Sequence, residues 1–287
     1  MASTDCWADW IRMRRTGGDA MAEAKLLEQL AVVRDRVLDN AALAPGERLL
    51  DVGCGNGLIA FGALEREAGE VVFADISEPL LDDCRALAAD AGVLGRCRFV
   101  TASADDLGSI ADGSVDVVTT RSVLIYVQEK ERAFREFHRV LRPGGRISVF
   151  EPINRFGMEK RRRSWGYDVP EAENLMRRVV DRFGELQPDT DPMLDFDERD
   201  LLELAERGGF FPITLDYSAT IEPPEPQDWE AFARSSGNPK IPTLEEAMAD
   251  VLTENERDRL VAEFRPTVEA GRGVWRMGKA YLWAVKP

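Results

Sequence analysis

Histidine is nearly absent from this sequence: its 287 residues include one, at position 138. His138 lies in a segment where Phe134, Phe137 and Leu141 recur at helical spacing, so we expect it to flank a buried helix face. A histidine with a structural part leaves no side chain of this type for general acid–base work. The sequence therefore predicts a mechanism that does not depend on histidine.

Cysteine is scarce as well, and its positions fit no zinc or redox spacing. The four cysteines are Cys6, Cys54, Cys84 and Cys97. A disulfide framework is typical of short secreted chains, and the first residues lack a basic segment followed by an apolar run. No apolar stretch approaches the roughly 20 residues that span a bilayer. We expect a cytoplasmic protein with no metal site and no membrane partner.

Basic residues are outnumbered, because 37 Lys and Arg oppose 52 Asp and Glu, for a formal net charge of −15. Such an excess of negative charge repels nucleic acids and anionic surfaces. One basic cluster, Lys160–Arg163, is short and is followed by acidic segments, so we interpret it as a solvated helical face rather than an anion site. The composition predicts no nucleic-acid partner and leaves the oligomeric state open.

Short apolar runs alternate with helical patterns from residue 48 onward. The expected strands are 48–52, 71–74, 98–101, 115–119 and 146–150, and the expected helices between them are 58–67, 78–91 and 129–141. Ser77 has the side chain of an N-cap, and Pro79 is tolerated in a first turn. Nearly unbroken apolar strands separated by helices indicate a parallel sheet that is covered on both faces.

A glycine-rich loop follows the first expected strand. The segment Leu49–Gly57 ends its strand at Asp51 and continues with Gly53, Gly55 and Gly57. A sharp turn from strand to helix needs dihedral angles that glycine adopts easily, and the start of the next helix suits a carboxylate. Asp51 can attract an ammonium group. Dinucleotide-binding loops have a G-x-G-x-x-G spacing, whereas position 58 here is leucine, which argues against a pyrophosphate ligand.

The strand, its aspartate and its G-x-G-x-G loop resemble the first motif of class I S-adenosylmethionine-dependent methyltransferases. This resemblance implies S-adenosyl-L-methionine as the cofactor and S-adenosyl-L-homocysteine as the product. It implies cofactor contacts at Asp51, Gly53, Cys54, Gly55, Asn56 and Gly57. For Cys54 we expect a small residue that fills the turn rather than a nucleophile.

The resemblance continues at the end of the second expected strand and beyond it. Asp75 stands where the family has a carboxylate that accepts both ribose hydroxyls, and Ile76 is implied as a further cofactor contact. Segments 112–118 and 141–147 resemble the family's entry into strand four and its turn into strand five. These two segments mark the fold and carry no chemistry.

The segment Ser103–Leu107 resembles the adenine-binding turn of the same family. On that resemblance Ala104 supplies a backbone amide and Asp105 a carboxylate to the ring edge. Asp106 is the alternative to Asp105 in that role.

The resemblance implies an α/β fold: a doubly wound, mostly parallel seven-stranded sheet with an antiparallel edge strand and helical insertions. It covers residues 47–151 and extends to the turn at Gly209-Phe210 and the last strand. We divide the chain into N-terminal helices that are a possible cofactor lid (1–45), a cofactor-binding core (46–151), an inserted cap (152–196), the completion of the sheet (197–221 and 279–287) and a helical insertion (222–278).

Methyl transfer from a sulfonium depends mainly on alignment and on exclusion of water, and it needs a base only when the acceptor loses a proton. Doubly wound sheets bind ligands at the carboxyl ends of their strands. The candidates there are Arg121, Ser122, Tyr126 and Glu151. Arg121 either engages the cofactor carboxylate or forms a salt bridge. Tyr126 and Glu151 are candidates for a base or an orienting group, with packing or surface roles as alternatives.

The sequence predicts a methyltransferase for a small-molecule acceptor in specialised metabolism. A protein or peptide methyltransferase and a non-catalytic cofactor-binding protein are the alternatives. Aromatic residues in the insertions either line an apolar acceptor pocket or form small cores of the insertions themselves. They are Phe156, Trp165, Tyr167, Trp229 and Trp275.

Overall fold

The computed structural model describes residues 5–157 and 164–287 and divides into two compact units. The sheet unit comprises Leu27–Ile153, Phe196–Ser218 and Lys279–Pro287. The helical unit comprises Met1–Leu26, Asn154–Asp195 and Ala219–Gly278. The basic cluster at 160–163 lies outside the described residues.

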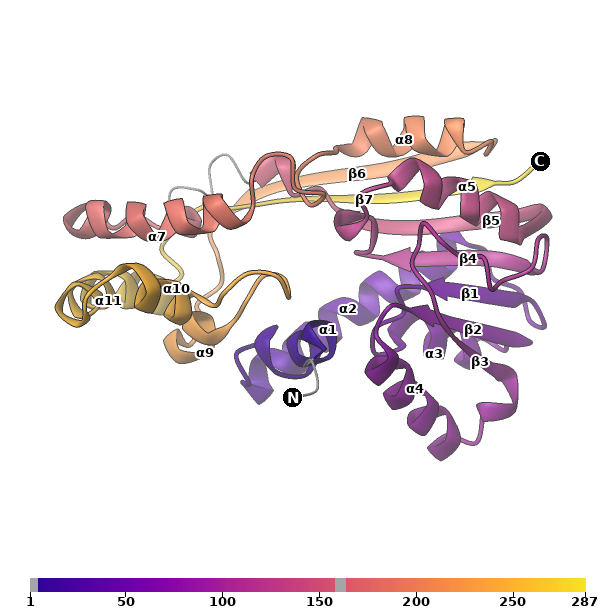
Figure 1. Cartoon of the computed structure of the whole chain (residues 1–287), viewed down its shortest axis with the longest axis horizontal. Helices are drawn as coiled ribbons and strands as arrows, with labels where there is room; N and C mark the ends of the chain where they lie inside the picture. Colours follow the sequence, from indigo (N-terminus) through magenta and orange to yellow (C-terminus); the bar gives the residue numbers. More distant parts are fainter. Residues whose placement is uncertain (1–4, 158–163) are drawn as a thin grey trace. The chain divides into compact units, whose positions relative to one another are not determined.

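One seven-stranded sheet organises the sheet unit, in the order β3-β2-β1-β4-β5-β7-β6 (Figure 1). The strands are β1 (Arg48–Val52), β2 (Glu70–Asp75), β3 (Cys97–Thr101), β4 (Val115–Arg121), β5 (Leu141–Pro152), β6 (Ile213–Glu222) and β7 (Trp275–Val285). Pairing is parallel from β3 to β5 and antiparallel between β5 and β7. The predicted doubly wound sheet is confirmed.

The strand order reverses at β1, whose neighbours are β2 on one side and β4 on the other. Val52 is in register with Ala74 of β2 and with Thr120 of β4, so the three strands end at the same level. In doubly wound sheets the connections diverge toward opposite faces at such a reversal, and ligands bind in the crevice at the carboxyl ends of the strands there. The loops after β1, β2 and β4 therefore meet at one edge.

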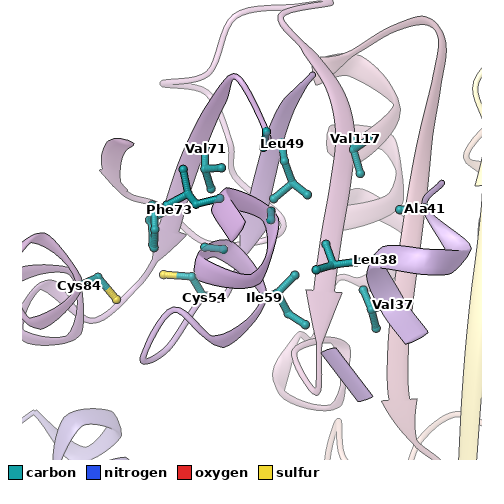
Figure 2. Packing of buried hydrophobic residues seen from close by; sticks show 14 of the residues in the cluster. Val37, Leu38, Ala41, Leu49, Cys54, Ile59, Val71, Phe73, Cys84 and Val117 are labelled. Atoms are coloured by element: carbon teal, nitrogen blue, oxygen red, sulfur yellow. The ribbon is translucent and has the colours of Figure 1, made fainter. Parts of the chain in front are cut away.

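Helices cover both faces of the sheet. On one face, α2 (Ala20–Asn40), α3 (Leu58–Glu65) and α4 (Glu78–Asp90) share a buried cluster with β1 and β2 (Figure 2). Leu49 of β1 and Val71 of β2 point into this cluster, and the next residue of each strand, Leu50 and Val72, is also buried. Because side chains alternate across a strand, burial of both sets requires cover on both sides. Ser77 caps α4 as expected.

The second face carries α5 (Lys130–Val140) and α8 (Glu198–Arg207). Phe134 of α5 packs on Phe210, which follows α8, with ring centroids 6.4 Å apart. Helix α5 runs directly into β5 at Leu141, so the expected turn 142–145 lies inside β5 as a bulge. Its register shifts from Val115↔Leu141 to Val117↔Arg146. The expected strand 146–150 is therefore shorter than the observed β5, Leu141–Pro152.

The helical unit has its own core, built from α7 (Glu173–Leu186), α9 (Trp229–Arg234), α10 (Leu244–Val251) and α11 (Glu254–Glu269). Thr243 and Thr253 open α10 and α11 with capping boxes. The N-terminal segment, α1 (Cys6–Asp9) and a π-helical turn (Trp10–Arg14), belongs to this unit. Trp10 Nε1 donates to the Ser236 carbonyl at 2.8 Å, and Arg14 pairs with Glu246 at 2.7 Å.

Four 3-10 turns complete the described elements: η2 (Leu94–Arg96), η3 (Leu124–Tyr126), η4 (Ser164–Gly166) and η5 (Pro170–Ala172). Over the described ranges, no helix combines the length and apolarity needed to cross a membrane. The same ranges contain no group of three or more His, Cys, Asp or Glu side chains that could hold a metal ion.

Candidate functional site

The glycine loop between β1 and α3 turns through left-handed backbone conformations. Gly53, Gly55 and Gly57 have φ angles of 65°, 54° and 80°, which only glycine adopts at little cost. The Cys54 amide donates to the Ala74 carbonyl at 3.0 Å and the Gly57 amide to the Cys54 carbonyl at 2.8 Å, so the loop is tied to β2 and to itself. The expected glycine conformations are present at the crevice edge.

Asp75 holds the loop to the end of β2. Its Oδ2 accepts the Gly55 amide at 2.8 Å and its Oδ1 accepts the Ser77 amide at 2.9 Å. The carboxylate is 6% exposed, whereas the adjacent Ile76 is 51% exposed. A ribose contact is the role that the sequence predicts for this carboxylate. Asp75 and Ile76 stay predicted cofactor contacts.

Asp51 lies deeper than its sequence position suggests, with 1% of its surface exposed. Its Oδ1 accepts the Thr119 hydroxyl at 2.9 Å and its Oδ2 accepts the Ala60 amide of α3 at 3.1 Å. Burial raises its pKa to about 7, while Thr119, Ala60 and the positive charge of Arg121 oppose the rise. Asp51 thus braces β1, β4 and α3, and an ammonium group nearby would favour its charged form.

The turn after β3 is closed by its own side chains. Ser103 pairs with Asp106 in an isolated bridge, and the Ser103 hydroxyl donates to the Asp105 carboxylate. Asp106 accepts the Gly108 amide at 3.3 Å and lies 4.0 Å from Arg132. Ala104 is buried and Asp105 half-buried. Asp106 therefore has structural partners outside the turn, which favours Asp105 for the predicted adenine contact.

Two thiols lie beneath the glycine loop. Cys84 Sγ of α4 donates to the Gly55 carbonyl at 3.4 Å, and Figure 2 shows the Cys54 and Cys84 sulfurs pointing toward one another. The hydrogen bond from Cys84 and the burial of Cys54 raise the pKa of the Cys54 thiol well above its usual range. A thiol held neutral is a poor nucleophile, so Cys54 acts as filler of the turn.

The segment after β4 packs directly on the glycine loop. Ser122 has a φ of 56°, a strained conformation for a residue with a side chain. A Cβ placed on Gly53 would lie 2.4 Å from Cγ2 of Val123. Arg121 at the end of β4 and Tyr126 in η3 are both half-buried. The structure brings Arg121, Ser122 and the loop together at one edge, as the sequence predicts.

Glu151, predicted as a candidate base or orienting group, is fully buried. Its carboxylate accepts the amides of Val123, Leu124 and Ile125 at 3.0, 2.9 and 3.3 Å. Burial raises its pKa to about 7, although these amides lower it. A carboxylate enclosed in this way holds the η3 turn, and we place it behind the reacting groups rather than among them.

His138 lies at the other end of the sheet, near the start of β5. Its ring packs edge-on against Phe210 with centroids 5.3 Å apart, and its carbonyl accepts the Lys286 amine at 2.7 Å. Burial and the charge of Lys286 lower its pKa. This structural environment is the one that the sequence predicts.

Among the aromatic residues of the insertions, Tyr167 and Trp229 are buried in the core of the helical unit and Trp165 packs against it. Trp165 meets Phe183 edge-on at 5.1 Å. Phe156 is 36% exposed and Trp275 is half-buried. Of the two interpretations left open, an internal core therefore describes Trp165, Tyr167 and Trp229.

Sequence reasoning missed three partners of the site. Thr119 points from β4 to Asp51, Cys84 reaches the loop from α4, and Lys130 closes the η3 turn. Thr119 had a signal, because a polar residue within the expected buried strand 115–119 needs a buried partner. Cys84 and Lys130 occupy ordinary helical positions, and their roles follow only from the tertiary structure.

Comparison with known proteins shows that part of this chain is similar to methyltransferases. Residues 50–149 match a family model described as a methyltransferase domain. The ubiquinone/menaquinone biosynthesis C-methyltransferase of Vibrio vulnificus is 36% identical over 116 residues, which are 40% of this chain and 44% of that protein. The enzyme of the same name from Yersinia enterocolitica is 40% identical over 116 residues, 40% of this chain and 46% of that protein. The matches thus span less than half of these relatives.

Solved structures resemble the chain over a greater length. A geranyl diphosphate C-methyltransferase from Streptomyces coelicolor, in complex with S-adenosyl-L-homocysteine, has a TM-score of 0.53 at 16% identity and covers 90% of this chain and 76% of its own. The (4+2)-cyclase SpnF has a TM-score of 0.54 at 23% identity, and the match covers 90% of this chain and 80% of the cyclase. At these identities the likeness concerns the fold.

Proposed function

The region 50–149 is a class I S-adenosylmethionine-dependent methyltransferase domain, and on that premise we propose that the chain methylates a small-molecule acceptor. The observation that carries the proposal is the loop geometry at the reversal of strand order. There, Gly53 and Gly55 adopt positive φ angles, and Asp75 binds the Gly55 amide from the neighbouring strand. S-Adenosyl-L-methionine supplies a methyl group on a positively charged sulfur when it is bound.

The residues at the crevice fit such a cofactor. The missing Cβ of Gly53 makes room for the Val123 side chain, and a backbone without a Cβ at Gly55 permits close approach of a flat or extended ligand. Asp75 offers carboxylate lone pairs at the end of β2, and the exposed Ile76 beside it offers an apolar surface. Ala104 and Asp105 complete the proposed set on the turn after β3. Arg121 is proposed to face the carboxylate of the cofactor.

The chain's contribution to the reaction is then mainly positional. Holding two reactants in line removes much of the entropic barrier of a displacement, and effective molarities of such arrangements reach roughly 10⁵–10⁸ M. Thr119, Asp75 and Glu151 make bonds that hold the loops rigid around the crevice. Tyr126, on the η3 turn, is the side chain that we propose to contact the acceptor.

A small-molecule acceptor is supported by the chemistry of relatives and by the charge of the chain. The Vibrio relative is named for quinone biosynthesis and the Streptomyces structure for geranyl diphosphate, both small molecules. The net charge of −15 disfavours nucleic acid. We propose specialised metabolism in the cytoplasm as the setting. A protein acceptor remains the alternative that an acidic surface favours, because it attracts basic peptides.

Binding and transfer are tested separately. Titration calorimetry is expected to show binding of S-adenosyl-L-homocysteine and none of NAD, and the reverse result would refute the proposal. Label from methyl-labelled S-adenosyl-L-methionine is then followed with pooled small metabolites and with basic peptides as acceptors. Label in small molecules supports the proposal and label in peptides supports the alternative. Binding without transfer to either pool indicates a non-catalytic cofactor-binding protein.

Asp75 is tested with the variants Asp75→Ala and Asp75→Asn. Loss of a buried carboxylate partner costs about 1–3 kcal/mol, so Asp75→Ala is expected to weaken S-adenosyl-L-homocysteine binding about 5- to 150-fold. Asp75→Asn keeps one acceptor oxygen and should fall between. The control is Glu78→Gln, an exposed carboxylate in the first turn of α4. Equal affinity of Asp75→Ala and wild type would place the ribose elsewhere.

A further inference from the structure

The η3 turn after β4 is held at its start by a buried carboxylate. Glu151 Oε1 accepts the amides of Val123 and Leu124, and Oε2 accepts the amide of Ile125. The first amides of a helical turn have no acceptor within the turn, and these three amides are of that kind. A negative charge at this end also matches the positive end of the turn's dipole. Glu151 comes from β5, the strand beside β4.

The other end of the same turn is held by a buried cation. Lys130 Nζ donates to the Val127 carbonyl at 3.0 Å, and Val127 is the residue that ends η3. The amine also lies 4.9 Å from the centre of the Phe196 ring. Lys130 is 6% exposed, and its charge lowers the pKa of Glu151. A three-residue turn thus has a buried carboxyl group at its start and a buried amine at its end.

This turn rests on the glycine loop. The Val123 side chain occupies the space where a Cβ of Gly53 would stand, and Ser122 before it is strained. A strained residue persists only where its surroundings hold it in place. Glu151 and Lys130 supply bonds to the residues that directly follow Ser122. Movement of η3 would therefore move the contact between Val123 and Gly53.

We propose that Glu151 and Lys130 are positioning residues for methyl transfer, which clamp η3 onto the glycine loop. They act through Val123 on the cofactor loop and through the placement of Tyr126 on the acceptor side. The inference rests on the proposed function, since it concerns the same crevice. It also explains why two charges are buried at the edge of the sheet, where apolar side chains would cost less to desolvate.

The test compares Glu151→Ala, Glu151→Gln and Lys130→Met by S-adenosyl-L-homocysteine titration and amide hydrogen exchange. Glu151→Ala removes all three acceptor bonds and is expected to weaken binding at least about 10-fold. It should also speed exchange at the Val123, Leu124 and Ile125 amides. Glu151→Gln keeps one oxygen acceptor, which can serve Val123 and Leu124, but it loses the charge and the acceptor of the Ile125 amide, so its affinity should fall between those of Glu151→Ala and wild type. Lys130→Met keeps the packing on Phe196 and should weaken binding at least about threefold.

The matched control is Asp116→Ala. Asp116 is also a buried carboxylate that accepts a backbone amide, from Arg48 at 2.7 Å, but it stands near the amino-terminal end of β4, opposite the carboxyl ends of the strands. Its loss should lower the free energy of unfolding and leave affinity unchanged. The clamp is overturned if folded Glu151→Ala binds as wild type, or if Asp116→Ala weakens binding equally.

Two further outcomes keep the test decisive. If Glu151→Ala does not fold, Lys130→Met decides, and wild-type affinity in that variant overturns the clamp. An affinity of Glu151→Gln no higher than that of Glu151→Ala also overturns it, because the retained bonds to Val123 and Leu124 would then contribute nothing. If wild-type protein itself binds no S-adenosyl-L-homocysteine, the proposed function fails, and this result is distinguishable from failure of the clamp.

Discussion

The contact between Gly53 and Val123 leads to a sharp prediction for Gly53→Ala. The new methyl group would lie 2.4 Å from Cγ2 and 3.2 Å from Cγ1 of Val123, closer than atoms can approach without a shift. Its residue would also keep a φ of 65°. The left-handed conformation costs roughly 1–2 kcal/mol and overpacking typically about 1–3 kcal/mol. The free energy of unfolding should fall by about 2–5 kcal/mol.

A second substitution separates the two costs. Val123→Ala removes both γ-methyl groups, and the nearest remaining atom is Cβ at 3.4 Å, an ordinary contact. In Gly53→Ala/Val123→Ala only the conformational cost should persist, so the two substitutions are expected to couple by about 1–3 kcal/mol with the sign of a rescue. The control is Gly92→Ala, with a φ of 70° and no described atom within 4 Å of an added Cβ. It measures the conformational cost alone.

Urea unfolding of the four combinations gives the coupling free energy, and titration with S-adenosyl-L-homocysteine gives the coupling in affinity. Affinity should fall in Gly53→Ala and recover in part in the double variant, since the loop and the η3 turn move together. Additive effects, with a coupling below about 0.5 kcal/mol, would refute the reasoning. So would a loss in Gly53→Ala no greater than that in Gly92→Ala.

Further predictions concern the buried Asp51 and the reactivity of the thiols. Because the pKa of Asp51 is raised to about 7 from 3.8, its contribution to stability is fully present below about pH 4 and is lost as pH rises through 7. Relative to Asp51→Asn, wild type should therefore lose stability on the order of 4 kcal/mol between pH 4 and pH 8, measured by urea unfolding, and a constant difference would contradict the raised pKa. For the thiols, a disulfide reagent should modify the exposed Cys6 rapidly, whereas Cys54 and Cys84 should react only on unfolding. Rapid reaction of all three in folded protein would mean that the loop opens.

Much of the sheet could be predicted because its information is local. Apolar runs such as 48–52 and 115–119 identify buried strands by themselves, and Ser77 identifies the start of a helix. The glycine loop was found by its position after a strand, and the role of Asp75 was implied by the resemblance to the methyltransferase family. These signals need no knowledge of which strands are neighbours.

The brace around the site depends on partners that are distant in the sequence. The Glu151 carboxylate accepts the amides of Val123–Ile125 from the segment after β4. The Thr119 hydroxyl donates to Asp51 from β4 to the neighbouring strand β1. The sequence does not distinguish a strand-end carboxylate that binds a ligand from one that faces water or accepts backbone amides. Its burial separates these cases, and burial follows from packing of the whole unit. The bulge at 142–145 was missed because its residues read as a turn in any context.

The position of β7 determines which fragments of this chain can fold and when β5 is paired during folding. Arg146 of β5 pairs with Val285, so the strand that closes β5 comes from a remote part of the chain. Long-range pairing of this kind slows folding and leaves a strand edge open in the meantime. A fragment that ended at residue 149, where the family match ends, would carry that open edge permanently and should self-associate. A fragment that keeps the edge of β5 paired must therefore retain β7, and the limits of a recognisable motif are narrower than those of a foldable unit.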